Sequence, residues 1–283
     1  MSEIRIISLT LAVVVALSGC GPGALYQAAY RGDTQKIASL LATGEKIEEG
    51  DSRGWTPLMI ASAEGHLDTV KLLLEKGANP NARNIHGRTA LMFAAHYGYA
   101  SIAEALLASG ADVNIIPTDV TGMPALIASV ERGHYQVVSL LLTHKADPNL
   151  KDKLGFDALF SATVAGNVMI VDLLLKNGAN PNTVNQQGNT PLLISINKGY
   201  ADIAVSLLAN GANPNSKSTM AGIEVTPLMV AANKGDSRVA KALIEKGARL
   251  NDRNWMGVSA LQYARNRNHS EVIKILIEAG ASE

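Results

Sequence analysis

Six histidines and one cysteine are the side chains of this 283-residue sequence with the widest chemical range. His86 and His96 are close enough in sequence to approach each other, but no carboxylate or cysteine stands near them at the spacing of metal ligands. His144 is alone in a connecting segment. The other three share one position, directly after a Gly or Asn, where we expect the imidazole to bond to backbone: His66, His134 and His269. The histidines therefore predict no metal site.

Motifs of known catalytic chemistry are missing from the sequence as well. It contains neither a Gly-rich loop that cradles phosphates nor the G-x-S-x-G turn that presents a nucleophilic serine. We therefore expect a protein that is not an enzyme and that uses no cofactor.

Cys20 follows a segment unlike the rest of the chain. Residues 6–17 form an apolar run interrupted only by Ser8 and Thr10, and Arg5 precedes it. This run is too short to span a bilayer and is typical of an export signal. Its end, Leu17-Ser-Gly-Cys20, resembles the cleavage box of bacterial lipoproteins. The alternative is a short apolar helix with an incidental cysteine.

The lipoprotein resemblance implies that residues 1–19 are a signal peptide and that Cys20 becomes acylated. The lipid would hold the protein on a membrane without a spanning helix. Gly21 stands where inner-membrane lipoproteins of the enterobacterial pattern have Asp, so we expect the outer membrane, facing the periplasm. Residues 20–23 are then a short tether. A single cysteine also means that no disulfide forms within the chain.

The charges of the chain balance, with 25 acidic and 25 basic residues. Removing residues 1–19 takes away Glu3 and Arg5, so the balance remains. A neutral chain has no basic field for phosphates, and we expect no binding of nucleic acid.

The elements that position these residues follow one pattern, best seen in residues 51–83. Thr56 and Pro57 predict a helix start, because a hydroxyl accepts from the free amides of the first turn and Pro has no N–H there to leave unpaired. We expect this helix to end at Gly65 and a second helix to end at Gly77. The second helix carries apolar residues at helical spacing: Leu67, Val70, Leu73 and Leu74. An extended hairpin should then lead into the next unit.

The unit recurs along the chain. Its aligned leucines are separated by steps of 33, 35, 33, 33, 36 and 33 residues: Leu58, Leu91, Leu126, Leu159, Leu192, Leu228 and Leu261. The two long steps add residues at 115–121 and 217–225, within hairpins, where insertions are tolerated.

The recurring residues resemble the ankyrin repeat: Gly54-Trp-Thr-Pro-Leu58, Ala61, Gly65-His66, Leu72-Leu-Leu74, Gly77-Ala78 and Asn81. The resemblance implies an all-α solenoid of about eight helix-turn-helix repeats with β-hairpin connecting loops, over residues 24–283. We place the repeats at approximately 24–50, 51–83, 84–116, 117–151, 152–184, 185–217, 218–253 and 254–283. The chain departs from the family at one position. Met59 and its equivalents replace the histidine that follows Thr-Pro-Leu in the family, so the hairpins lack the hydrogen bonds that this histidine would make to the loop backbone.

The two ends of the array differ from its middle. The first copy lacks the hairpin and the Thr-Pro start. In the last copy, Gln262 and Arg265 stand where the earlier copies have apolar or small residues. Polar groups at stacking positions suit a terminal repeat, since no further repeat covers them.

Positions that vary between copies are free to contact a partner. In ankyrin proteins, as the resemblance implies, partners dock on the concave side, on hairpin tips and on the last residues of the first helix. The candidate contacts in this chain are Tyr30, Arg31, His86, Arg88, His96, Tyr97, Glu131, Arg132, Asn197, Lys198, Asn233, Lys234, Trp255, Asn266 and Arg267. A solvated face that only keeps the repeats soluble is the alternative.

Together these patterns predict a monomeric, lipid-anchored periplasmic scaffold that binds another protein through its concave face. An immunity or inhibitor protein that masks a toxin or an enzyme is the second possibility. A hydrolase with catalytic residues contributed by several repeats is a remote third.

Overall fold

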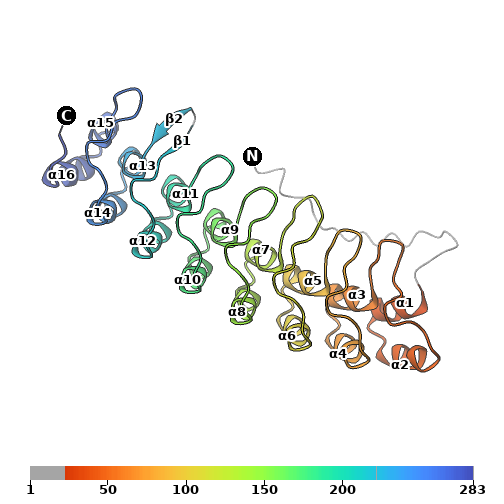
Figure 1. Ribbon diagram of the computed structural model, residues 1–283. Coiled ribbons are helices and arrows are strands. Elements are labelled where there is room, and N and C mark those ends of the chain that lie inside the picture. The colour runs from red at the N-terminus through yellow and green to blue at the C-terminus, as the bar shows by residue number, and fades with distance from the viewer. Residues whose placement is uncertain (1–22, 221, 283) are drawn as a thin grey trace.

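The computed structural model describes residues 23–220 and 222–282. The predicted signal peptide and Cys20 lie outside these residues. The described chain forms eight successive pairs of short helices, stacked side by side in chain order (Figure 1). The first helix of each pair, called the inner helix below, is α1 (Ala24–Arg31), α3 (Pro57–Glu64), α5 (Ala90–Tyr97), α7 (Ala125–Glu131), α9 (Ala158–Ala165), α11 (Pro191–Lys198), α13 (Pro227–Lys234) or α15 (Ala260–Asn266).

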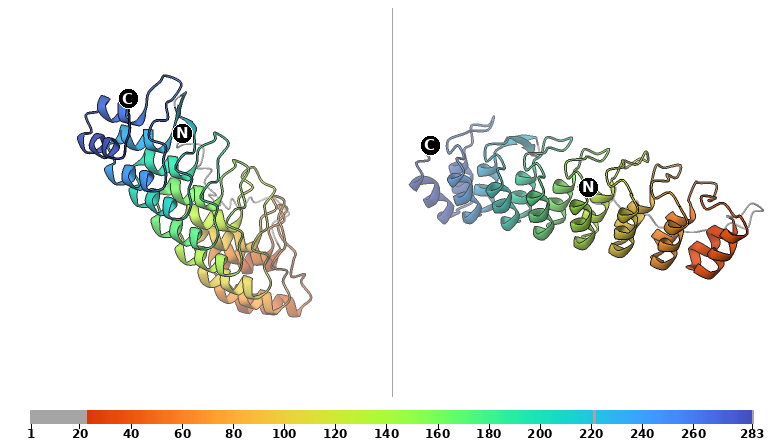
Figure 2. Two further views of the ribbon diagram at one scale, coloured as in Figure 1. Left: turned by 60° about the vertical axis from the view of Figure 1, so that its left-hand side comes forward. Right: turned by 60° about the horizontal axis from the view of Figure 1, so that its bottom comes forward.

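The second helix of each pair is called the outer helix. The outer helices are α2 (Thr34–Ala42), α4 (Leu67–Glu75), α6 (Ala100–Ala108), α8 (Tyr135–Thr143), α10 (Val168–Lys176), α12 (Ala201–Ala209), α14 (Ser237–Glu245) and α16 (Ser270–Glu278). Loops that connect the pairs all project on one side of the stack, beside the inner helices (Figures 1 and 2).

Local sequence explains where the inner helices begin and end. The Thr56 hydroxyl accepts from the Met59 amide at 3.3 Å, and Pro57 occupies the first helical position. Thr190 and Thr226 act in the same way on later helices. Gly65 ends α3 in the left-handed conformation, with φ of 83°, which a residue without a Cβ adopts at little cost. The structure confirms the predicted helix start at Thr56-Pro57 and the predicted helix end at Gly65.

The core runs along the whole stack. Each inner helix packs on the next inner helix, and each outer helix packs on the next outer helix. The seven aligned leucines, from Leu58 to Leu261, are all at most 3% exposed. A single pair of helices cannot bury such residues by itself, so each repeat depends on its neighbours for stability.

Asparagines at the bases of the loops link successive repeats. The Asn81 side chain donates to the Gly110 carbonyl at 3.0 Å and accepts from the Asp112 amide at 2.7 Å. The same two bonds recur at the next four steps: Asn114, Asn149, Asn182 and Asn215. One short side chain thus satisfies two backbone groups of the following repeat.

The loops are less regular than the predicted hairpins. Within the described residues, paired strands occur only in the 217–225 insertion, where β1 (Ser218–Met220) pairs antiparallel with β2 (Ile223–Val225), and one isolated bridge joins Arg253 to Ser259. Elsewhere a carboxylate or amide oxygen holds the turn by accepting from amides two and four residues ahead, as in Asp51, Asn84, Asp152, Asn185 and Asn254. These bonds stiffen the loops without the family histidine.

Gln262 in the last repeat has a local role that the sequence did not reveal. Its side chain accepts from the Ser259 amide at 2.9 Å, while the Ser259 hydroxyl accepts from the Gln262 amide at 3.3 Å. This reciprocal pair caps α15. Arg265 is exposed, as a terminal repeat allows. In the part of the chain that the structure describes, no helix has the length and apolar character needed to cross a bilayer.

Candidate interaction surface

The last residues of the inner helices form a continuous row. Every inner helix is followed by a left-handed residue, Gly in seven repeats and Asn268 in the eighth, so the side chain just before this turn lies at an equivalent place in each repeat. Since the inner helices stack in order, these side chains follow one another along the molecule. We call them the end row: Arg31, Glu64, Tyr97, Arg132, Ala165, Lys198, Lys234 and Arg267. All eight are exposed or partly exposed.

Arg88 lies in a loop beside the N-terminal half of the end row. Its Nε donates to Asp119 Oδ2 of the next loop at 2.5 Å. Burial works against ionisation of Asp119, but hydrogen bonds from Thr121, Arg88 and Gly122 lower the pKa of its carboxyl below the ordinary value. Arg88 is therefore part of an ion pair between two loops, and much of its charge is neutralised. His86 is exposed, and its carbonyl accepts from the amides of Thr118 and Asp119.

His96 is held between two repeats. Arg132 Nη2 donates to His96 Nε2 at 3.2 Å, so this nitrogen carries no proton. Burial, followed by the positive charges of Arg132 and Arg88 and by His134, lowers the pKa of His96 to about 4. The imidazole is thus neutral at pH 7. It cannot contribute a cation to the surface, although it fixes the position of Arg132.

Aromatic rings surround His96. The Tyr97 ring meets it edge-on at 4.9 Å between centroids and stacks on Tyr99 at 6.1 Å. Burial, followed by the nearby Glu64 carboxylate, raises the pKa of Tyr97. Tyr30 and Glu131, the other candidates in this half, are partly buried, whereas Arg31 is exposed. This half of the surface is aromatic, and it holds the ion pair between Arg88 and Asp119.

The C-terminal half of the end row is cationic. Lys198 Nζ lies 5.8 Å from the centroid of the Tyr200 ring, and Arg267 Nε donates to Asn233 Oδ1 at 3.2 Å. Lys234 is exposed, and no ion pair involving Lys198, Lys234 or Arg267 occurs among the described residues. Asn197 and Asn266 are exposed beside them, and Asn233 is partly buried. These asparagines and cations therefore follow one another along the last three repeats.

The two tryptophans differ in exposure. Trp55 is 6% exposed and stacks on Phe93 with ring centroids 4.2 Å apart, so it belongs to the core. Trp255, at the tip of the last loop, is 70% exposed, and Met256 beside it is 55% exposed. Trp255 is available to a partner.

The three histidines that share one repeat position bond to backbone, as predicted. His66, His134 and His269 use Nε2 to bond to the carbonyls of Tyr30, His96 and Asn233 at 3.0, 3.1 and 3.2 Å, each in the preceding repeat. His144 bonds through Nδ1 to the Leu140 carbonyl of its own helix. No group of three or more His, Cys, Asp or Glu residues in 23–220 and 222–282 could hold a metal ion.

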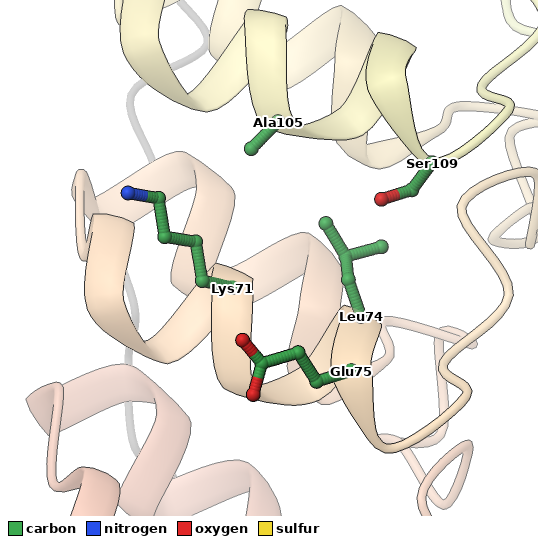
Figure 3. Close-up of a pocket in the computed structure, with 5 residues that line it drawn as sticks. All are labelled: Lys71, Leu74, Glu75, Ala105 and Ser109. Carbon is green, nitrogen blue, oxygen red and sulfur yellow. The ribbon is translucent and has the colours of Figure 1, made fainter.

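A shallow pocket lies between two outer helices, away from the end row. It has a volume of about 310 Å³ and lies between α4 and α6 (Figure 3). Its lining combines one cation, one carboxylate and small or apolar groups: Lys71, Leu74, Glu75, Ala105 and Ser109. No nucleophile and base meet in it, so the pocket offers no catalytic arrangement.

Comparison with known protein families identifies the repeated unit. The model described as "Ankyrin repeats (3 copies)" matches residues 9–84, 25–117, 83–152, 126–218 and 219–283, which together cover nearly the whole chain. The chain belongs to the ankyrin-repeat family. The match confirms the predicted resemblance to the ankyrin repeat and the all-α ankyrin solenoid of about eight repeats.

Comparison with solved structures finds 613 chains that match this one. One is the crystal structure of the ankyrin repeat domain of Bcl-3, described as a unique member of the IkappaB protein family. It has 28% sequence identity and a TM-score of 0.68, and the match covers 80% of this chain and 99% of that one. No curated protein sequence matches the chain. Ankyrin repeats are typically scaffolds for protein–protein interaction.

The sequence did not reveal the residues through which one ankyrin repeat contacts the next. Asp119 binds Arg88, and the rings of Tyr99 and Tyr200 lie against Gly65 and Gly166 of the preceding repeats. Tyr99 and Tyr200 occupy the same position as His66 in their own repeats. This shared position could have predicted the contacts, because a large polar ring recurs there in several repeats.

Proposed function

We propose that this ankyrin protein is a non-enzymatic scaffold that binds another protein through the end row and the adjacent loops, and that a lipid on Cys20 anchors it in the bacterial envelope. The observation that carries the proposal is a contrast between two sets of positions. Stacking positions such as the aligned leucines are constant, whereas the end row ranges from Glu64 through Tyr97 to Lys234 while remaining accessible. Stacking does not require different residues along the end row, so these residues are available to recognise a partner.

The anchoring part of the proposal rests on Cys20 and on the short tether. Helix α1 begins at Ala24, so only three residues, 21–23, separate it from Cys20. Three extended residues reach about 10 Å. A lipid on Cys20 would therefore keep the first repeat at the headgroups while the later repeats extend away from the anchor. We place this arrangement at the outer membrane, facing the periplasm.

Photo-crosslinking from matched positions tests the binding proposal. Ala165 ends inner helix α9, and Ala209 ends outer helix α12, and both are exposed. A photoreactive residue at position 165 should capture a defined protein in intact cell envelopes, and the same residue at 209 should not. Equal capture from both positions, or none from 165, would contradict binding on the end row.

The anchor has a separate test. Cys20→Ser should abolish incorporation of a labelled fatty acid and release the protein from the membrane fraction, because the thiol that accepts the lipid is gone. Unchanged labelling and membrane association in the variant would exclude the lipoprotein proposal and leave the binding proposal intact.

A further inference from the structure

We propose that the C-terminal half of the end row binds an extended acidic segment of the partner protein, with one carboxylate near each of Lys198, Lys234 and Arg267. This inference rests on the proposed function and gives the chemistry of the partner. It follows from where the charges lie in this half of the molecule, from the spacing of the repeats, and from the absence of an acid among the described end-row residues from α11 onward.

Charge is distributed unevenly along a neutral chain. Residues 191–283 contain eleven Lys and Arg against eight Asp and Glu, a net charge of +3, whereas residues 24–190 contain thirteen against sixteen, a net charge of −3. A positive field over the last three repeats favours the approach of an anionic partner to this end.

Four acidic residues of the C-terminal repeats interact with groups outside the end row. Asp202 of α12 pairs with Arg238 of α14 at 2.6 Å, and Glu271 of α16 lies 3.9 Å from Lys241 of α14. Glu224 pairs with Lys217 in the β1–β2 loop at 2.8 Å. The Asp236 carboxylate caps α14 by accepting from the Val239 amide. In the described repeats from α11 onward, the end row carries three cations and no acid.

Spacing defines the shape of the segment that fits. Packed helices lie about 8–10 Å apart, so consecutive cations of the row are separated by roughly that distance. An extended chain advances about 3.3 Å per residue, and three residues therefore span one repeat. A segment with a carboxylate at every third position would place one beside each cation. A run of adjacent carboxylates would not.

A protein segment suits this surface better than a nucleic acid. Nucleic-acid binding depends on many phosphate contacts and a strong basic field, and this chain has no net charge. Asn197 and Asn266 are exposed beside the cations and can donate and accept hydrogen bonds, which suits the amides of a peptide backbone. The exposed Trp255 at the end of the stack adds apolar contact area.

The test uses the full chain in detergent and a labelled dodecapeptide with glutamate at every third position, measured by fluorescence polarisation at low and high salt. We expect saturable binding that weakens with salt. The variant K198E/K234E/R267E should bind at least about tenfold more weakly, because three attractions become repulsions. The matched control K71E/K241E/K274E reverses three exposed cations midway along outer helices and should bind as the wild type does.

Three results would overturn the inference. These are equal peptide affinity in the end-row variant and the wild type, equal affinity for a peptide of the same composition with its glutamates adjacent, or equally tight binding of a single-stranded oligonucleotide. Circular dichroism and urea unfolding of both variants establish that they are folded. Capture of a partner from position 165, which is uncharged, would persist in any of these cases, so failure of this inference is distinguishable from failure of the proposed function.

Discussion

His96 shows how a single side chain on this surface depends on the neighbouring repeat. Read from the sequence, it is a histidine near the end of a helix and a candidate for pairing with His86. In the structure it accepts a hydrogen bond from Arg132, 36 residues away, and lies among Arg88, His134 and Tyr97. Partial burial and the adjacent cations both disfavour its protonated form. Its contribution is to position Arg132.

The lowered pKa of His96 predicts a pH dependence of stability. Between about pH 6.5 and 4 the unfolded chain binds a proton at this residue that the folded chain does not, so folding loses stability as the pH falls through this window. His96→Gln keeps an acceptor for Arg132 but cannot titrate. Relative to wild type, its free energy of unfolding should improve by about 1–2 kcal/mol from pH 7 to pH 4, after allowance for solvent screening of a half-buried group.

Urea unfolding at a series of pH values measures this difference. The two proteins differ only at residue 96, so the difference between their curves reports on this side chain. Parallel curves for the two proteins across the window would mean that His96 protonates equally well in the folded and unfolded states.

Adjacent repeats interlock where a ring of one lies against the turn of the other. A Cβ added to Gly98 would lie 2.6 Å from Nδ1 of His134, and one added to Gly65 would lie 2.9 Å from the Tyr99 ring. His134 cannot swing away without breaking its 3.1 Å bond to the His96 carbonyl. Glycine is thus required at such turns for two reasons: its positive φ and the close approach of the next repeat.

A pair of glycine substitutions separates these two reasons. Gly98 has φ of 80° and a ring against it, whereas Gly199 has φ of 78° and no atom within 4 Å of an added Cβ. Gly199→Ala should cost only the strain of a left-handed alanine, about 1–2 kcal/mol. Gly98→Ala should cost about 1–3 kcal/mol more, because the methyl group overpacks against His134. Urea unfolding gives both values.

Removing the ring provides the control for this comparison. In a His134→Ala background, the additional cost of Gly98→Ala should largely disappear, since the methyl group then has space. Equal losses for the two glycines in the wild-type background would show that the ring does not restrict the turn.

Over the whole molecule, stability should depend on how many neighbours a repeat has. Leu174 of α10 and Leu276 of α16 are both 0% exposed, yet α10 packs between α8 and α12, while α16 has only α14 beside it among the outer helices. Leu173, by contrast, is only partly buried, so Leu174 is the better probe of the central core.

Truncation of these two leucines tests the solenoid arrangement. Leu174→Ala should lower the free energy of unfolding by about 2–5 kcal/mol, the usual cost of a cavity in a well-packed core. Leu276→Ala should cost clearly less, because a terminal repeat has one neighbour and relaxes more readily. Equal losses in urea would indicate a core shared by all repeats, as in a globular domain.

The sequence by itself determined the repeating architecture of this protein. Helix starts at Thr-Pro, helix ends at Gly, the apolar spacing of the outer helices and the step of about 33 residues are all local signals, and the structure reproduces them. The backbone bonds of His66, His134 and His269 were also foreseeable, because these three histidines recur at one repeat position. Local rules suffice here, since each repeat uses the same short elements.

Only the tertiary structure decided which surface charges remain available. Arg88 and Asp119 are 31 residues apart, Arg132 and His96 are 36 apart, and Arg267 and Asn233 are 34 apart. Each of these pairs joins different repeats, so it depends on the rotation and separation between repeats and on side-chain rotamers that no local pattern encodes. The sequence therefore indicated the candidate residues, while the packing of repeats paired Arg88 with Asp119 and kept His96 neutral. Among the described residues, Lys198, Lys234 and Arg267 are in no ion pair.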